Sequence, residues 1–358
     1  MRVFDEQIMK EANAKLFSNI NIITINIIFV YTPVKVGSTT LVTSIRISAA
    51  EKFIVIHIHN EDCLSVLTGI KNITINDLIL YNSYIGKNVY VIDIYRSPIE
   101  RKISTFFEYI YMHFNNSLDE INKYPLDKLI TRFNNLFPHI ANDDYYFEKY
   151  NIEISKKFDF NNKFLITTQN YVKYIKLRLK DSNEWGSILS DLLETEIVVV
   201  NDHETNNKVI KDIYTKFKEE YKLPENLYEL IKNDKYLNYY YSADEINIYM
   251  NEWSNKTNYF NIWNSYNEKE YELYLKITVE NQSKNCIQYN HYIDLGCLCK
   301  LCSNKRNIIK EKAKRGEKIN DTINHSELVN GQFEQIKIQK IMQDRVIFLN
   351  KFKKIIKK

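Results

Sequence analysis

The feature that most constrains this chain is a strand pattern that passes directly into a helix pattern near its start. Residues 20–31 are rich in β-branched side chains and end at Thr32-Pro33, and apolar residues then recur at helical spacing over residues 38–50. A nearly continuous apolar strand is typical of a parallel sheet that is covered on both faces. This segment therefore predicts an α/β fold.

The later chain repeats the alternation of strands and helices. We expect further strands at residues 53–59, 88–95, 163–168 and 196–200, and helices at residues 97–113, 184–194, 203–220 and 225–237. Strands that alternate with helices pack as three layers, with a mostly parallel central sheet flanked by helices.

The composition fits such a fold and excludes others. With 358 residues, 44% of them hydrophobic, the chain can fill a large core, and 7 Gly and 5 Pro exclude a collagen-like or linker-rich protein. The residue pattern changes near position 281. We therefore expect an α/β domain over residues 1–280, with residues 114–160 inserted on the substrate side, and a small helical extension over residues 281–358.

The expected extension is basic. The net charge of the chain is +4, but residues 300–358 carry +10 and residues 1–299 carry −6. A basic segment attracts polyanions. Apolar residues also recur at helical intervals among the lysines after position 338, so the tail has three possible roles: docking on the body, formation of a homodimer, or contact with an anionic surface.

The turn after the first strand has the composition of a phosphate-binding loop. Lys35 supplies a cation, Gly37 allows a close backbone approach, and the hydroxyls of Ser38, Thr39 and Thr40 follow at the start of the helix. A Walker A loop is excluded, because that motif needs a lysine after its second glycine and an earlier glycine. The alternative is an ordinary strand-to-helix turn with a hydroxyl cap.

A second motif follows the strand at residues 88–95. Ser97 begins a capping-box pattern, so Arg96 lies where the strand ends and a helix begins. Arg101 and Ser104 share one side of that helix. An arginine at the carboxyl end of a strand is well placed to bind phosphate, and the alternative is a surface ion pair.

Together the two motifs resemble the nucleotide site of sulfotransferases that use 3′-phosphoadenosine 5′-phosphosulfate (PAPS), in particular the carbohydrate type that includes the uronyl 2-O-sulfotransferases of heparan and dermatan sulfate. In this family a strand leads into a P-K-x-G-[ST]-[ST]-like loop, and a later strand ends in R-x-P-x-x-R-x-x-S. One extra residue separates Pro33 from Lys35 here. The residues that match are Lys35, Gly37, Ser38, Thr39, Thr40, Arg96, Pro98, Arg101 and Ser104.

The resemblance covers residues 20–112 and implies a P-loop-like fold with a definite chemistry. The protein would transfer a sulfuryl group from PAPS to a hydroxyl, expected on a glycan, and would require no metal. Lys35 would stabilise the departing phosphate, the loop that follows it would hold the 5′-phosphosulfate, and Arg96 with Ser104, beside Arg101, would hold the 3′-phosphate.

Such a reaction also needs a general base. His57 and His59 lie on one face of the second strand, and His59 lies near its carboxyl edge, so both are candidates. Related heparan-type enzymes place a catalytic carboxylate near the end of this strand, and this resemblance favours His59 or Glu61. The alternative for the histidines is a structural hydrogen bond. The histidine that the uronyl enzymes use before the third strand has no counterpart, since no histidine lies between His59 and His113.

Other interpretations stay open at this stage. The chain can be an inactive protein that binds PAPS or its product on the same fold, a P-loop kinase, or a nucleic-acid-binding module centred on the basic tail. Cys297, Cys299 and Cys302 are candidate zinc ligands, with Cys286 or His291 as a further donor, and free thiols are the alternative. No segment has the pattern of a signal peptide or membrane span, so we expect a cytoplasmic protein.

Overall fold

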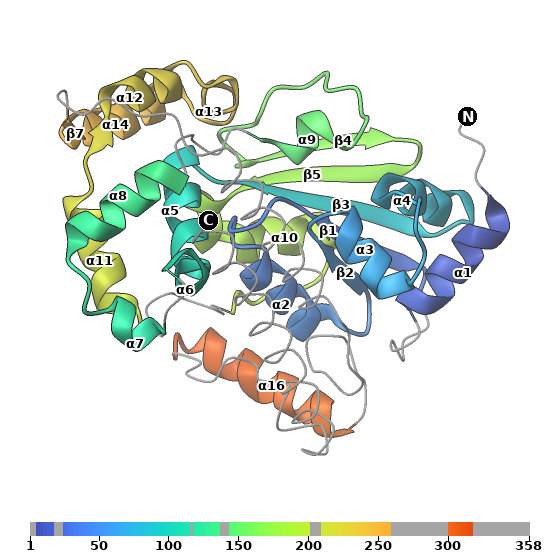
Figure 1. Cartoon of the computed structure of the whole chain (residues 1–358). Coiled ribbons are helices and arrows are strands. Elements are labelled where there is room, and N and C mark those ends of the chain that lie inside the picture. Colours follow the sequence, from blue (N-terminus) through green and yellow to red (C-terminus); the bar gives the residue numbers. More distant parts are fainter. Residues whose placement is uncertain are drawn as a thin grey trace.

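The computed structural model describes residues 5–17, 24–114, 117–136, 143–200, 209–258 and 300–317 (Figure 1). These segments form an α/β protein whose five-stranded central sheet is mostly parallel and is flanked by helices, which confirms the fold class expected from the sequence. The strand order is β2-β1-β3-β5-β4.

The first strand of the chain lies in the middle of the sheet. The parallel strands are β1 (Asn26–Tyr31), β2 (Ile54–Ile58), β3 (Asn88–Tyr95) and β5 (Val172–Arg178). In register, Ile27 of β1 faces Ile54 of β2 on one side and Val89 of β3 on the other. The edge strand β4 (Phe164–Gln169) runs antiparallel to β5.

Two hydrophobic cores explain why β1 is apolar throughout. Ile28 and Val30 point into a core with α2 (Ser38–Ala49) and α10 (Trp185–Leu193). Ile27 and Phe29 point the other way, into a larger core. The helices that contribute to this second core beside the sheet are α1 (Glu6–Leu16), α3 (Glu61–Thr68), α4 (Ile75–Tyr84) and α5 (Pro98–Glu108).

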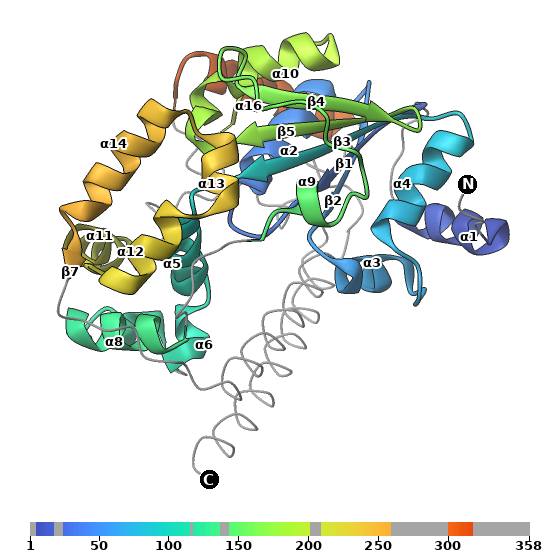
Figure 2. The same ribbon diagram turned by 90° about the horizontal axis from the view of Figure 1, so that it is seen from above.

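A group of helices lies to one side of the sheet, beyond α5 (Figures 1 and 2). Its members are α6 (Ile110–Phe114), α7 (Leu118–Ile121), α8 (Leu126–Leu136), α11 (Lys211–Glu220), α12 (Glu225–Lys232), α13 (Lys235–Tyr240) and α14 (Ala243–Ser254), with the short parallel pair β6 (Leu223–Pro224) and β7 (Thr257–Asn258). Phe106 of α5 lies with its ring centroid 5.3 Å from that of Phe133 and 6.1 Å from that of Phe217. The larger core therefore continues from the sheet into this group.

The basic segment begins with α16 (Lys300–Lys314), which packs against α2. Ile309 is buried in this contact, and Lys310 and Lys314 both form ion pairs with Glu196. The apolar tail after residue 338 lies outside the described residues. Its expected docking, dimerisation or surface binding stays a prediction.

The expected strand at residues 196–200 is wrong. This segment forms no strand, and the backbone amides of Val198 and Val200 bond to side chains of α2 instead of a neighbouring strand. Val198 N–H donates to Ser48 Oγ and Val200 N–H donates to Ser44 Oγ, both at 2.9 Å. Two serines one helical turn apart thus replace a β-ladder.

The sequence pattern also failed to identify β5 and the breaks in two helices. β5 reads VKYIKLR, and its buried Lys176 and Arg178 look like surface residues until their carboxylate partners are known. The helix expected at 97–113 ends at Glu108 and resumes as α6. The helix expected at 225–237 divides at Asp234, whose side chain caps α13 by accepting from Leu237 N–H.

Candidate functional site

The topology itself marks a ligand site at the carboxyl edge of the sheet. From β1 the chain crosses through α2 to β2 on one side, and then through α3 and α4 to β3 on the other side of β1. The loops after β1 and β3 therefore diverge toward opposite faces. In open α/β sheets ligands bind in the crevice at such a reversal of strand order.

The loop between β1 and α2 has the backbone shape of an anion cradle. Lys35 and Gly37 both have left-handed backbone conformations, with φ of 63° and 89°. A turn of this kind brings successive amides toward one side, and α2 adds the positive end of its dipole. The φ of Gly37 makes any other residue at this position strained, and a Cβ there would also lie 2.5 Å from Leu179 Cδ1, so that the leucine side chain would have to shift.

The two sequence motifs meet at this loop although they lie 61 residues apart. Arg96 Nη1 donates to the carbonyl oxygen of Lys35 at 2.8 Å. One turn further along α5, Arg101 Nε donates to the carbonyl oxygen of Val34 at 3.1 Å. Both guanidinium groups thus fix the backbone of the loop from the side of β3.

The remaining contacts of these arginines are with the protein as well. Arg101 forms a bidentate ion pair with Asp143, with Nη1–Oδ1 and Nη2–Oδ2 distances of 2.9 and 3.1 Å. Burial opposes ionisation of Asp143, but the charge and hydrogen bonds of Arg101 outweigh it and lower the pKa of this carboxyl. Burial lowers the pKa of Arg96, and a hydrogen bond with Tyr214 opposes that shift.

Lys35 also has a carboxylate partner. Its Nζ lies 3.1 Å from Oε2 of Glu108, the last residue of α5, and the two side chains keep 25% and 33% of their surface exposed. Near them, burial and the charge of Arg101 lower the pKa of Lys102 to about 8. The loop thus collects cations, and Glu108 and Asp143 supply negative charge beside it.

Both histidines of the second strand contact the loop. His57 Nε2 lies 3.0 Å from Ser38 Oγ, and His59 Nδ1 lies 2.8 Å from the carbonyl oxygen of Thr32. Since a carbonyl only accepts, Nδ1 of His59 carries the proton and Nε2 carries the lone pair. Burial, with help from Lys35, lowers the pKa of His59 to about 4, so the ring is neutral near pH 7.

Glu61 is placed differently from the other expected residues. Its carboxylate accepts from Ile75 N–H at 2.9 Å, at the start of α4, and from the Tyr31 hydroxyl at 3.4 Å. Tyr31 and α4 belong to the larger core, on the sheet face opposite α2. Burial raises the pKa of Glu61, and its contacts join α3 to the start of α4 and to the end of β1.

The hydroxyls of the two motifs also differ in position. Ser38 is buried and engaged by His57, whereas Thr39 and Thr40 are half-buried in the first turn of α2. Ser104 is 7% exposed on α5, and among the described residues no hydrogen bond joins it to the loop. The structure thus brings Arg96 and Arg101 to the cradle through direct hydrogen bonds, and the phosphate-binding role of the Ser104 hydroxyl stays a prediction.

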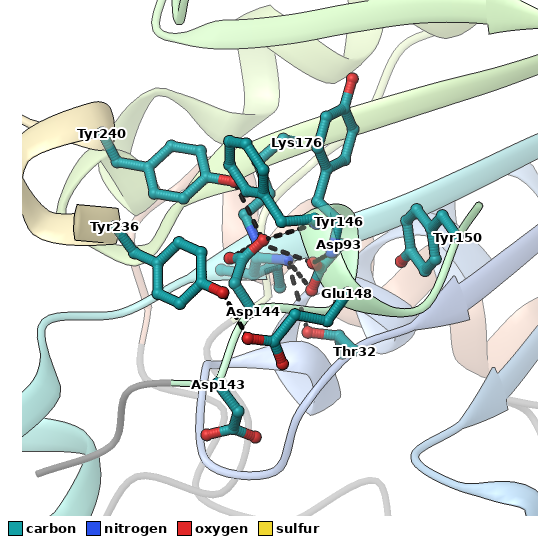
Figure 3. Close-up of polar contacts among 12 residues, drawn as sticks. Thr32, Asp93, Asp143, Asp144, Tyr146, Glu148, Tyr150, Lys176, Tyr236 and Tyr240 are labelled. Atoms are coloured by element: carbon teal, nitrogen blue, oxygen red, sulfur yellow. Dashed lines mark hydrogen bonds and ion pairs between the residues drawn. The ribbon is translucent and has the colours of Figure 1, made fainter. Parts of the chain in front are cut away.

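A buried charge network lies directly beneath the loop (Figure 3). Lys176 Nζ of β5 contacts Asp93 Oδ2 of β3 at 2.6 Å and Asp144 Oδ2 at 2.5 Å, and all three side chains are at most 1% exposed. Burial raises the pKa of Asp93 to about 6, the charge of Asp144 adds to the shift, and Lys176 and the Thr32 hydroxyl oppose it.

The network also fixes the segment around α9 (Tyr145–Glu148) above the sheet. Tyr146 N–H donates to Asp93 at 3.1 Å, and the Tyr240 hydroxyl donates to Asp144 at 3.1 Å. Asp143 and Asp144 therefore face in two directions, one toward Arg101 and one toward Lys176. The signal that could have revealed this network is Asp93, the one charged residue in the otherwise apolar sequence of β3.

Metal ligands are a separate question. Across the described ranges, no group of three or more His, Cys, Asp or Glu side chains is arranged to hold a metal ion. Cys286, His291, Cys297 and Cys299 lie outside those ranges, as does the side chain of Cys302, so the zinc hypothesis stays a prediction. None of the helices in the described part is both long enough and apolar enough to cross a membrane.

Comparison with known proteins adds no family to this geometry. No protein-family model, no curated protein and no solved structure matches the chain.

Proposed function

We propose that this protein is a PAPS-dependent sulfotransferase that acts on a hydroxyl acceptor, with a glycan as the acceptor class, on a P-loop-like fold. The observation that carries the proposal is the hydrogen bond from Arg96 to the Lys35 carbonyl. It joins the two halves of the expected nucleotide site at the point where β1 and β3 end. The cradle amides and the cations beside them suit a phosphorylated ligand.

The reaction would proceed by in-line displacement without a required metal. The acceptor oxygen attacks sulfur, the bond from sulfur to the bridging oxygen breaks, and the electron pair passes to the 5′-phosphate of adenosine 3′,5′-bisphosphate. Lys35 and the amides after it stabilise the charge that develops on that oxygen. The acceptor proton leaves to a base.

His59 is the histidine whose electrostatic surroundings respond to a bound anion. Burial lowers the pKa of His59 most, and the charges of Lys35 and Arg101 add to that shift. A bound phosphosulfate would offset the contribution of the two cations, so the pKa of the ring would rise when the ligand binds. His57, bonded to Ser38, and Glu61, bonded to α4, are weaker candidates by their contacts.

The first test is a comparison of ligands. We expect adenosine 3′,5′-bisphosphate to raise the melting temperature of the protein more than ATP with Mg²⁺, and labelled PAPS to transfer its sulfuryl group to a member of a glycan panel. If ATP with Mg²⁺ raises the melting temperature and adenosine 3′,5′-bisphosphate does not, the result would instead favour a P-loop kinase.

The second test is the variant Lys35→Ala. We expect the transfer rate to fall about a hundredfold or more, because one preorganised donor to the developing charge is lost. Lys10→Ala removes the same charge from the exposed face of α1, where Lys10 pairs only weakly with Glu6, and should leave the rate unchanged. Equal rates for the two variants would exclude the proposed role of Lys35.

A second function is favoured by a specific observation. Arg96 and Arg101 both donate to loop carbonyls, and Arg101 is also paired with Asp143. These contacts use donors of both guanidinium groups within the protein and leave fewer of them for a reacting ligand, so we propose as the alternative a protein that binds PAPS or its product without turnover. Binding of labelled PAPS without transfer to any acceptor in the panel would support this alternative.

A further inference from the structure

We propose that Glu108 is an internal competitor for the anion site, which occupies Lys35 in the empty protein and must yield when a phosphorylated ligand binds. This inference rests on the proposed anion-binding role of the loop. It concerns a residue outside both sequence motifs, and it predicts how selective the site is for highly charged ligands.

The position of Glu108 carries the argument. Its Oε2 lies 3.1 Å from Lys35 Nζ, which is the distance at which a phosphate oxygen would bind the same ammonium group. The N–H group of Lys35 that points at Glu108 cannot at the same time bind a phosphate oxygen. The free energy of binding a ligand at Lys35 therefore includes the cost of displacing this carboxylate.

The second carboxylate beside the loop is not expected to exchange in the same way. Asp143 holds Arg101 through two hydrogen bonds to a guanidinium that is 10% exposed. Its neighbour Asp144 is buried against Lys176, which fixes the backbone at this point. Glu108 and Lys35 are joined through one nitrogen–oxygen contact at 3.1 Å, without the bidentate geometry of the Arg101–Asp143 pair, so we expect this pair to be the weaker one.

The competition has a consequence for ligand selection. The cost of displacing this carboxylate is common to all ligands, so only a ligand with several negative charges gains enough from the cradle and the cations beside it to offset that cost. A monoanion of similar size would bind poorly. Glu108 would thus favour a phosphorylated nucleotide over the small anions of the surrounding solution.

The experiment measures binding of two probes, adenosine 3′,5′-bisphosphate and inorganic pyrophosphate, by calorimetry on the full chain. In Glu108→Gln, which keeps the size of the side chain, we expect both probes to bind about three- to thirtyfold more tightly. Glu120→Gln is the matched control, because it removes the same charge from α7, where Glu120 pairs with Lys123 on the exposed surface. The gain should shrink as salt is added.

A double-mutant cycle tests whether Glu108 acts through Lys35. On a Lys35→Met background the further change Glu108→Gln should give no gain in affinity, because no ammonium remains to be released. Thermal unfolding without ligand verifies that each variant is folded.

The outcomes separate this inference from the proposed function. Equal affinities of wild type and Glu108→Gln for adenosine 3′,5′-bisphosphate would overturn the inference and leave the function standing. A gain for pyrophosphate, with the nucleotide binding no better than pyrophosphate, would support the inference and count against the function. No binding of either probe to any variant would overturn both. Loss of transfer with unchanged binding would also overturn the inference, since it would make Glu108 a catalytic group.

Discussion

Lys176 shows how a charged residue can lie inside a parallel strand. Its ammonium group is fully buried and contacts the carboxylates of Asp93 and Asp144, and its Nζ lies 4.9 Å from the ring centroid of Tyr240. A buried charge is tolerated only when it is paired and hydrogen-bonded, and here each carboxylate receives further donors from the backbone. Removing Lys176 would leave the two buried carboxylates without a partner of opposite sign.

Replacing Lys176 by Met is therefore expected to be strongly destabilising. Two carboxylates would face each other in the core without a cation, at a cost of about 3–5 kcal/mol in the free energy of unfolding. Urea unfolding followed by circular dichroism measures the loss. Lys173→Met, an exposed position on the same strand, is the control and should change stability by less than about 1 kcal/mol. Equal losses at the two positions would show that the buried pairing is energetically unimportant.

Asp93 gives the protein a pH dependence of defined sign. Its pKa is about 6 in the folded chain, mainly through burial, and about 3.9 is usual for an unfolded one. Between these values the folded state holds more protons at this site. The contribution of Asp93 to stability is thus largest below about pH 4 and falls as the pH rises through about 6.

The variant Asp93→Asn isolates this contribution. Asn cannot titrate, so the free-energy advantage of wild type over the variant should narrow when the pH rises from about 4.5 to about 7. Urea unfolding of both proteins at each pH provides the measurement. An advantage that grows with pH would mean that Asp93 is more acidic in the folded protein than in the unfolded chain.

At the scale of elements, α2 connects the loop to its surroundings. Its first turn carries the cradle hydroxyls, and Ser44 and Ser48 on its far side bind the extended segment 196–200. The Ser44 hydroxyl also donates to the Thr40 carbonyl at 2.6 Å. One helix therefore positions the loop and also supplies the hydrogen-bond acceptors that a neighbouring strand would otherwise give to residues 196–200.

The variant Ser48→Ala tests this replacement locally. Without the hydroxyl, the amide of Val198 loses its acceptor, so its hydrogen exchange should accelerate by about fivefold, which corresponds to about 1 kcal/mol for one hydrogen bond. The amide of Val200, bonded to Ser44, is an internal control and should change little. Unchanged exchange at Val198 would mean that packing alone protects the segment.

At the scale of the whole molecule, the sheet and the lateral helices share one core. The cluster that begins at β1 and α1 extends through α5 to Phe217 and Tyr221 and reaches Trp253 in α14. A shared core predicts that both parts unfold together, in a single cooperative transition.

Tryptophan fluorescence can test this cooperativity. Trp185 reports on the sheet and Trp253 on the lateral helices, and both are buried. With Trp263 replaced by Phe throughout, Trp185→Phe and Trp253→Phe leave one reporter each. In each variant we expect the fluorescence midpoint in urea to coincide with that of far-UV circular dichroism. Separate midpoints would indicate two independently stable parts.

Local pattern was enough to predict several parts of the fold. The β-branched runs of β1, β2 and β3, the helix that begins at Ser38 and the α/β class follow from periodicity, which depends on neighbours in sequence. The capping box expected at Ser97 is wrong, because Ser97 makes no side-chain cap and Glu100 accepts from Tyr249 and Trp253 instead. Lys35, Gly37, Arg96 and Arg101 were candidates from the same local evidence. The strand prediction for residues 196–200 was wrong because the apolar pattern of this segment does not indicate that serines of α2 accept its backbone hydrogen bonds.

The sequence by itself determined which residues are apolar on both faces of a strand and where loops must follow strands, because those properties are set by neighbours along the chain. Only the tertiary structure decided that Arg96 reaches the Lys35 carbonyl, that Asp93, Asp144 and Lys176 neutralise one another, and that Glu108 lies against Lys35. Each of these contacts joins residues more than thirty positions apart. The sequence alone does not show what a charged residue does, since its pKa and its partner depend on which distant groups the fold buries beside it.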